Sequence, residues 1–307
     1  MTEGDIYDII LSGGDILIFN KTISCKAFAK INLYLDVTKK RDDGFHDIKS
    51  IMQSVSLCDD IEICLSEIAD DTIECNIPDI PTDSSNLVIK AADSYRKATG
   101  KNFGARFKIN KKIPSSAGLA GGSSDAAATL RLLNKLNREA LSEAKMLEIA
   151  ASVGSDVPFC YVGGTVLCEG RGEILTSLNT CPTFHIVVAV KGEGVSTPKA
   201  YRDIDEIYGD FSSSHDEGRL NNIMRGLEIC DTSLICSGLY NIFESVVEKE
   251  RPNVALLKKV MDKNGALCSM MSGSGPSVFG IFSDENSAEK AKNELLLSGA
   301  SAYKCTT

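Results

Sequence analysis

The sequence has 307 residues, of which 43% are hydrophobic and 24% charged, and this composition predicts a globular chain with room for two domains rather than a disordered one. The formal net charge of −9 argues against general binding to nucleic acid or to an anionic membrane surface, because the chain has no excess of basic side chains to collect phosphates. Any phosphate binding must therefore be local.

The N-terminal residues carry acidic side chains where a secretory signal would carry basic ones. No apolar run in the sequence reaches the length of a membrane span. We therefore expect a soluble, cytoplasmic protein that has no membrane partner.

The 11 cysteines are an odd number and form no C-x-x-C pair. Scattered cysteines of this kind favour small buried side chains in a reducing compartment over a disulfide framework, and a redox or metal role is the weaker interpretation.

Hydrophobic periodicity predicts strands and helices that are interspersed along the chain. In chain order, the expected strands are 31–37, 60–65, 105–109, 185–190 and 277–282. The expected helices are 86–98, 124–138, 142–153, 253–264 and 287–298. The turn-rich stretch 163–173 indicates a boundary, so we predict two α+β domains, 1–172 and 173–307, and the polar stretch 211–220 predicts an exposed loop or a helix entry.

The stretch IPSSAGLAGGSSDAAATL, residues 113–130, joins a glycine- and serine-rich segment to a strong helix former, with Ser123, Ser124 or Asp125 placed to cap the helix. Glycines let a ligand approach the main chain, and the unpaired amides of a first helical turn favour an anion. This pattern predicts a phosphate-binding loop, although a plain strand-to-helix turn would explain the glycines alone. Neither a P-loop nor a dinucleotide-binding glycine pattern is present in its required context.

Three further stretches decide between these interpretations: AFAKINLYLDVTKKRDDGFHDI at 27–48, GSDVPFCYVGG at 154–164 and MMSGSGPSVFGIF at 270–282. Together with the loop from Pro114 to Asp125, they make the chain resemble the GHMP kinase superfamily from about residue 23 onward. AKINLYL with DGFH and GSDVPF is similar to the branch that acts on a cytidyl substrate. The resemblance implies ATP-dependent phosphorylation of a small alcohol.

The same resemblance implies an α+β, two-domain GHMP kinase fold, with an N-terminal ribosomal protein S5 domain 2-like domain and a C-terminal ferredoxin-like α/β domain. It also implies that Asp156 binds substrate and accepts the proton of the attacking hydroxyl, while Lys30 keeps Asp156 ionised. Taken alone, Lys30 is either a paired lysine among apolar neighbours or an edge-strand charge, and Asp156 is a turn residue that can bond its own backbone.

By resemblance the glycine-rich loop holds the phosphates of ATP, and two residues elsewhere lie near the adenine. The loop residues are Pro114, Ser116, Ala117, Gly118, Leu119, Ala120, Gly121, Gly122, Ser123 and Ser124; the adenine-side residues are Asn86 and Lys111. Helix capping by Asn86 and a solvated charge at Lys111 are the simpler readings. Mg²⁺ is implied as the complex with ATP, with Ser124 as a candidate contact and no metal site made by the protein alone.

On the substrate side, Asn32 follows Lys30 on the same strand face and matches a contact to the polar end of the substrate. His46 matches a reader of the base edge, or else is a surface histidine after a glycine turn. Phe45, where the family more often has tyrosine, and Tyr201 match the aromatic pair that encloses the base. The segment 272–276 is either a turn before a strand or, as the resemblance implies, a part of the site supplied by the C-terminal domain.

Three alternatives stay open at this level. A GHMP kinase for another small alcohol, such as mevalonate or homoserine, is the nearest; a sensor that binds ligands without turnover is possible in principle, although Lys30 and Asp156 argue against it. Binding of RNA is the weakest, because of the acidic charge. The sequence does not determine the oligomeric state, nor whether residues 1–22, which extend beyond the usual family start, add a strand or precede the true start.

Overall fold

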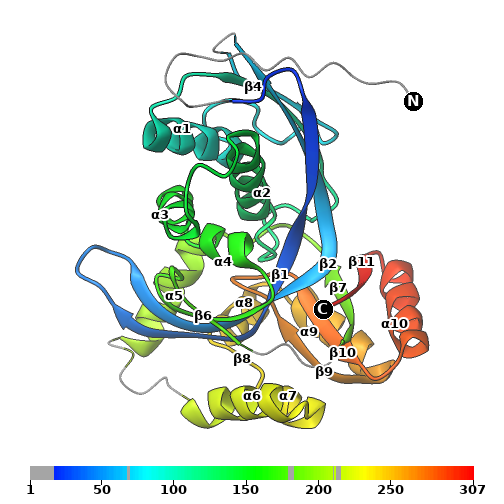
Figure 1. Ribbon diagram of the computed structural model, residues 1–307. Coiled ribbons are helices and arrows are strands. Elements are labelled where there is room, and N and C mark those ends of the chain that lie inside the picture. The colour runs from blue at the N-terminus through cyan, green and yellow to red at the C-terminus, as the bar shows by residue number, and fades with distance from the viewer. Residues whose placement is uncertain (1–16, 68–69, 179–182, 210, 212–215) are drawn as a thin grey trace. The chain divides into compact units, whose positions relative to one another are not determined.

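The computed structural model describes residues 17–67, 70–178, 183–209, 211 and 216–307, and these form two compact units that the chain visits in turn (Figure 1). Unit 1 comprises the residues up to Ala27, Cys58–Lys112 and Gly122–Tyr161, and unit 2 comprises Phe28–Leu57, Ile113–Gly121 and Val162–Thr307. The extension 1–16 lies outside the described residues. The predicted boundary at 172/173 is not a border of either unit, because long strands and the glycine-rich loop carry the chain between them; as a domain boundary it stays a prediction.

Unit 1 places helices along one side of its strands (Figure 1). The second half of β2 (His46–Ser66) pairs antiparallel with β4 (Gly104–Asn110), and β3 (Thr72–Cys75) pairs parallel with β4. Alternation in β4 buries one face of the strand. The helices are α1 (Leu87–Thr99), α2 (Gly121–Leu136), α3 (Glu143–Val153) and α4 (Val157–Val162), of which α2 and α4 each continue across the border of the unit.

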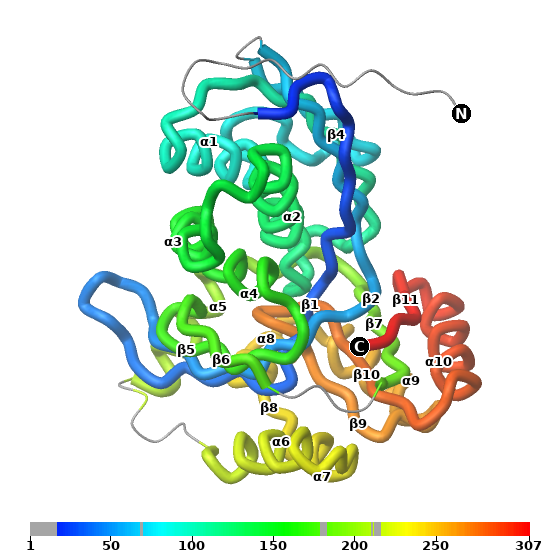
Figure 2. The backbone as a smooth tube through the Cα atoms, viewed as in Figure 1, coloured from blue at the N-terminus to red at the C-terminus, as the bar shows by residue number. Residues whose placement is uncertain are grey.

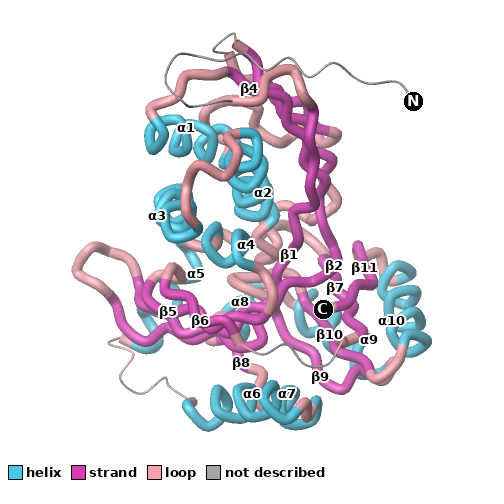
Figure 3. Tube along the Cα trace, viewed as in Figure 1, coloured by secondary structure: helices cyan, strands magenta, loops and turns pink. Residues whose placement is uncertain are grey.

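Unit 2 contains two groups of strands, drawn in magenta in Figure 3. In the first group, β1 (Thr22–Lys40), which enters from unit 1, pairs parallel with β8 (Tyr240–Asn241), and the first half of β2 pairs with β5 (Thr165–Gly170), which pairs with β6 (Ile174–Ser177). The second group is an antiparallel sheet in the order β11-β7-β10-β9. Its strands are β7 (His185–Val190), β9 (Ala266–Met271), β10 (Val278–Phe282) and β11 (Ser301–Thr306).

Six helices complete unit 2 as described; α9 and α10 pack on the four-stranded sheet (Figure 2), and α7 contacts its strand β9. They are α5 (Thr197–Tyr208), α6 (Glu217–Ile229), α7 (Thr232–Ser237), α8 (Glu244–Glu250), α9 (Asn253–Lys263) and α10 (Glu285–Leu297). A continuous core, which includes Ile31, Leu33, Ile223 and Phe279, lies in this unit. It holds the strand that carries Lys30 and Asn32 in a fixed position.

The five predicted strands and five predicted helices are all confirmed, with differences mainly at their ends. One difference bears on the site. Helix α2 begins at Gly121, three residues earlier than predicted, so the expectation that Ser123, Ser124 or Asp125 caps it is wrong. Of the predicted polar stretch 211–220, residues 212–215 lie outside the described part, and α6 begins at Glu217.

The cysteine prediction is confirmed at five positions and wrong at others. Cys58, Cys64, Cys160, Cys168 and Cys305 are buried thiols outside any disulfide, as small apolar side chains would be. Cys236 and Cys268 form a disulfide, with their Cα atoms 5.6 Å apart, so the prediction against disulfides is wrong here. The residues are 32 positions apart, and only the packing of α7 against β9 brings them together.

Within the described ranges, no helix combines the length and the apolar character that crossing a membrane requires.

Candidate active site

Lys30 is a buried lysine with a defined partner. Its side chain is on β1, only 3% of the residue is exposed, and Nζ donates a hydrogen bond of 2.7 Å to Asn32 Oδ1. Its backbone N–H donates to Leu119 O in the glycine-rich loop at 3.2 Å. The alternative that Lys30 is an edge-strand charge in solvent is wrong, because a buried ammonium must be hydrogen-bonded and this one is.

Asn32 has its carboxamide orientation fixed by three hydrogen bonds. Oδ1 accepts from Lys30 Nζ and, at 2.9 Å, from the backbone N–H of Gly273. Nδ2 donates to Ser50 Oγ at 2.9 Å, and Ser50 Oγ donates in turn to Tyr34 O at 2.7 Å. Because Asn32 is only 1% exposed, these contacts leave it little freedom to turn.

The glycine-rich loop and the segment 272–276 lie against each other in unit 2. Ser272 Oγ donates to Gly118 O at 3.1 Å, and the N–H of Ser277 donates to Ala117 O at 3.2 Å. A Cβ on Gly118, whose φ is +79°, would lie 2.1 Å from Ser272 O. The segment 272–276 therefore packs on the loop at a distance that only glycine at position 118 permits. It is more than a turn that leads into β10.

The loop itself has the backbone of a close-approach turn. Ala117 and Leu119 are buried and anchor it, whereas Ser116 and Ala120 adopt left-handed φ values of +53° and +57°. Ala120 thus carries a backbone conformation that costs an alanine about 1–2 kcal/mol. The loop runs directly into α2, and the backbone amides of a first helical turn have no partner within the helix itself.

These amides fit the phosphates of a nucleotide, since a helix N-terminus favours an anion. Gly121 belongs to unit 2, and Gly122, Ser123 and Ser124 belong to unit 1. Ser124 is 1% exposed and its Oγ lies 3.3 Å from Cys160 Sγ. A role of Ser124 as a magnesium contact stays a prediction.

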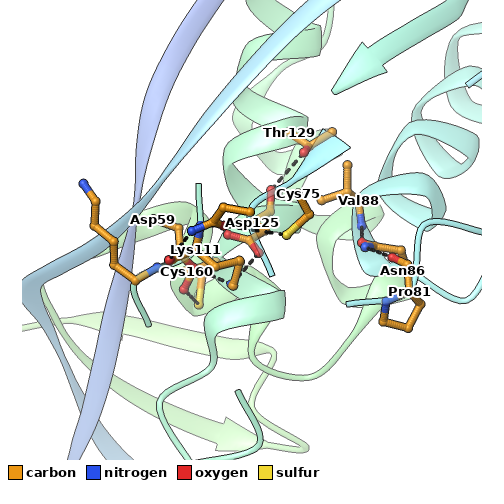
Figure 4. Close-up of polar contacts among 12 residues, drawn as sticks. Asp59, Cys75, Pro81, Asn86, Val88, Lys111, Asp125, Thr129 and Cys160 are labelled. Carbon is orange, nitrogen blue, oxygen red and sulfur yellow. Dashed lines mark hydrogen bonds and ion pairs between the residues drawn. The ribbon is translucent and has the colours of Figure 1, made fainter. Parts of the chain in front are cut away.

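Lys111 is not the solvated charge that was the simpler reading of the sequence. It is 6% exposed, and its ammonium is bound by the carboxylates of Asp59 and Asp125 in unit 1 (Figure 4). The contact to Asp125 Oδ2 is 2.7 Å. The three side chains connect β2, the end of β4 and α2, so Lys111 fixes the first turns of α2; a contact between Lys111 and adenine stays a prediction.

Burial raises the pKa of Asp125 to about 7, although the Lys111 ammonium acts in the opposite direction. Two carboxylates share one ammonium here, and among the described residues Asp125 Oδ1 has no hydrogen-bond partner. Between about pH 4 and pH 7 the folded chain therefore holds a proton that the unfolded chain has lost, and this contribution to stability declines as the pH rises.

Replacing Asp125 with asparagine is expected to remove that decline. From about pH 5 to about pH 7, the free energy of unfolding of Asp125→Asn should improve relative to wild type by up to about 1.4 kcal/mol per pH unit. Urea denaturation of both proteins at each pH measures this difference in free energy of unfolding. Asp60→Asn is the matched control, because the pKa of Asp60 is lowered by its bond to Lys112 and its effect should be constant over this range. If the difference in free energy of unfolding between Asp125→Asn and wild type is also constant from about pH 5 to about pH 7, the raised pKa of Asp125 is contradicted.

Asp156 lies in the turn that the sequence predicted, immediately before α4. The N–H of Val157 donates to Gly154 O at 3.1 Å, and the backbone carbonyl of Asp156 accepts from Cys160 N–H at 3.0 Å. Asp156 is half-buried and belongs to unit 1, whereas Lys30 belongs to unit 2. Their pairing stays a prediction.

His46 and Tyr201 are brought together from β2 and α5. Their rings stack with centroids 4.7 Å apart, and the rings of His46 and Phe211 make an edge-to-face contact with centroids 5.7 Å apart. His46 is 9% exposed, so the alternative that it is a surface histidine is wrong. Its Nε2 lies 2.7 Å from Asp205 Oδ1, which means that a base edge could be read by Nδ1 or by the backbone but not by Nε2.

Phe45, by contrast, is 50% exposed, and one face of its ring is covered by the guanidinium of Arg171 at 4.2 Å. Only the other face is open to a stacking partner. Whether Phe45 and Tyr201 enclose a base stays a prediction.

Two segments of the chain match known protein families. Residues 86–164 match the GHMP kinases N terminal domain and residues 214–300 match the GHMP kinases C terminal domain. The 4-diphosphocytidyl-2-C-methyl-D-erythritol kinase of Caldicellulosiruptor bescii is 41% identical over 88% of this chain and 93% of that protein, and the enzyme of the same description from Geobacillus thermodenitrificans is 40% identical over 89% and 92%.

The chain belongs to the GHMP kinase family, in its 4-diphosphocytidyl-2-C-methyl-D-erythritol kinase branch. As a GHMP kinase it is a phosphotransferase that uses ATP. A crystal structure of a 4-(cytidine 5'-diphospho)-2C-methyl-D-erythritol kinase superposes with a TM-score of 0.74 at 29% identity, covering 92% of this chain and 98% of the other. L. major mevalonate kinase, at 14% identity, covers 95% and 98% with a TM-score of 0.76 and shows the shared fold alone.

The sequence patterns of this GHMP kinase did not predict the residues whose side chains bind and orient the predicted site residues. Ser50 and Asp59 on β2 fix Asn32 and Lys111, and Asp205 binds His46. A signal existed for Asp205, because it follows Tyr201 by four residues on α5 and must share its helix face. No local signal could have connected Ser50 with Asn32.

Proposed function

We propose that this chain transfers the γ-phosphoryl group of ATP to the 2-hydroxyl of 4-diphosphocytidyl-2-C-methyl-D-erythritol, with the 2-phosphate and ADP as products, in the non-mevalonate synthesis of isoprenoid precursors. The observation that carries the proposal is the buried Lys30–Asn32 pair in contact with both glycine segments. The similarity to kinases described as acting on this substrate supports it over almost the whole chain.

Phosphoryl transfer needs in-line positioning and stabilisation of charge more than covalent chemistry from the protein. In the proposed mechanism the carboxylate of Asp156 accepts the proton of the attacking hydroxyl, and the ammonium of Lys30 holds Asp156 ionised and orients that hydroxyl. Asn32 fixes the direction of the Lys30 ammonium and faces the polar end of the substrate. The backbone amides of the loop and of the first turn of α2 bind the phosphates.

Mg²⁺ enters this proposal as part of the nucleotide complex. Within the described ranges, no group of three or more His, Cys, Asp or Glu side chains could hold a metal ion. Magnesium commonly binds through phosphates with one or two side chains and several waters, and it would supply charge neutralisation on the phosphates. We propose a cytoplasmic location for the reaction, on the same similarity.

A coupled assay of ADP release tests the function. Purified protein with ATP and Mg²⁺ is given the cytidyl substrate, mevalonate or homoserine in parallel, with Asp156→Ala as the control. Turnover of the cytidyl substrate alone, abolished in the control, is the expected result. Turnover of mevalonate or homoserine instead would overturn the substrate, and tight binding without any turnover would overturn the enzymatic role.

Replacing Tyr201 with alanine is expected to raise KM for the cytidyl substrate by roughly 5- to 150-fold, because stacking on an aromatic ring contributes about 1–3 kcal/mol per base. KM for ATP should be unchanged, and Tyr201→Phe, which keeps the ring, should behave as wild type. Steady-state kinetics with each substrate varied in turn measures both. Tyr303→Ala, on β11, controls for loss of a tyrosine elsewhere in unit 2. An unchanged KM for the cytidyl substrate would remove Tyr201 from the base site.

A further inference from the structure

Asn241, on the two-residue strand β8, is a buried amide with both of its side-chain hydrogens committed. It is 5% exposed, and Nδ2 donates to Met271 O and to Gly273 O, each at 2.8 Å. Its Oδ1 accepts the backbone N–H of Phe243 at 3.0 Å. No role in the site was assigned to this residue by the sequence patterns.

The backbone from Met271 to Gly273 is thereby held on two sides. On one side, Asn241 of β8 binds two of its carbonyls, and Oε2 of Glu244, the first residue of α8, accepts the N–H of Met271 at 2.7 Å. On the other side, the N–H of Gly273 donates to Asn32 Oδ1. Asn241 thereby holds the peptide groups on either side of the Ser272–Gly273 peptide. The carbonyl of that peptide, Ser272 O, accepts the N–H of Gly275 at 3.0 Å, and because a peptide group is planar this contact also restrains the direction of the Gly273 N–H.

The same Asn32 oxygen receives the ammonium of Lys30. A Cβ on Gly273 would lie 3.3 Å from Lys30 Nζ, so the segment also limits the space in which that ammonium can move. Asn241, Gly273, Asn32 and Lys30 thus form a continuous chain of contacts within unit 2.

We propose that Asn241 is a positioning residue for phosphoryl transfer, acting through Gly273 and Asn32 to hold the ammonium of Lys30 in its working place. The inference rests on the proposed function, in which Lys30 orients the reacting groups. Displacement of such a group by about 1 Å can lower a rate on the order of 100-fold, even when the change lies outside the chemistry.

Asn241→Asp keeps the shape of the side chain but cannot donate, and it places a carboxylate against two carbonyl oxygens. We expect kcat to fall by roughly 10- to 100-fold with KM for ATP unchanged. Asn134→Asp is the matched control: Asn134 is a 7% exposed amide of α2 in unit 1 whose Nδ2 donates to Leu141 O. Its variant should lose stability but keep kcat per folded molecule. If Asn241→Asp does not fold, Asn241→Ser is used in its place. Serine keeps one hydrogen-bond donor, so kcat should fall less than in Asn241→Asp.

Two further measurements separate positioning from general destabilisation. In a Lys30→Met background, Asn241→Asp should cost no further activity, because its effect passes through Lys30; independent losses that multiply would overturn the proposal. Acylation of the Lys30 amine, followed by mass spectrometry, should be faster in Asn241→Asp than in wild type and Asn134→Asp. This second readout needs no turnover. Inactive wild-type protein would defeat the proposed function, whereas equal acylation in all three proteins would defeat the role of Asn241.

Discussion

Asp156→Asn is expected to lower kcat for the cytidyl substrate by roughly 10²- to 10⁴-fold, which is the contribution of a positioned general base. Asparagine has nearly the same shape but no basic oxygen at neutral pH. The backbone contacts of the turn, from Val157 N–H to Gly154 O and from Cys160 N–H to Asp156 O, do not use the replaced atom and should persist. KM for ATP should therefore change little, and single-turnover kinetics would assign the loss to the chemical step.

Asp284→Asn is the matched control for this substitution. Asp284 also precedes a helix, where its side chain accepts from Ser287 N–H, and asparagine caps a helix as well as aspartate does. Its kcat should equal that of wild type. A loss of less than about threefold in Asp156→Asn would remove Asp156 as the base, since even a weak general base contributes more.

Gly118→Ala should be the most damaging small substitution in the glycine-rich loop. The new Cβ would lie 2.1 Å from Ser272 O. The Cβ is fixed to the backbone of residue 118 and Ser272 O is itself a backbone atom, so neither can move away without breaking the Ser272–Gly118 contact. Together with the left-handed φ of +79°, we expect a loss of roughly 2–5 kcal/mol in the free energy of unfolding. kcat/KM should fall as well, because separation of the segments moves Gly273 away from Asn32.

Gly299→Ala isolates the clash from the backbone strain. Its φ of +80° is almost the same, and no atom of the described residues lies within 4 Å of the added Cβ. Chemical denaturation should show only about 1–2 kcal/mol for this variant, with activity unchanged. Equal losses in the free energy of unfolding of the two variants would mean that the contact between the loop and the segment 272–276 does not contribute to stability.

Much of the regular structure follows from local pattern. Helix α1 was expected at 86–98 and spans Leu87–Thr99, because Asn86 accepts from Val88 N–H to cap it and Gly100 ends it in a left-handed conformation. Strands β3 and β8 were not predicted, because segments of four and two residues are too short to show a hydrophobic periodicity. Pairing with long neighbours stabilises them.

The candidate site likewise contains some contacts that the sequence predicted and others that it did not. The spacing of two residues between Lys30 and Asn32 put both on one face of a strand, and their hydrogen bond confirms it. The burial of Lys111 between Asp59 and Asp125 did not follow from its sequence, in which three polar residues in a row give no sign of a core position.

By itself, the sequence determined the family, the loop that leads into α2, and the residue types proposed for the chemistry, because these depend on neighbours along the chain. Tertiary structure alone decided which groups hold them: Gly273 meets Asn32 across 241 positions, Asn241 reaches Gly273 from another strand, and Tyr201 stacks on His46. The physical reason is that a buried polar atom takes whichever partner the packed core brings within hydrogen-bond distance, and no local periodicity encodes that partner.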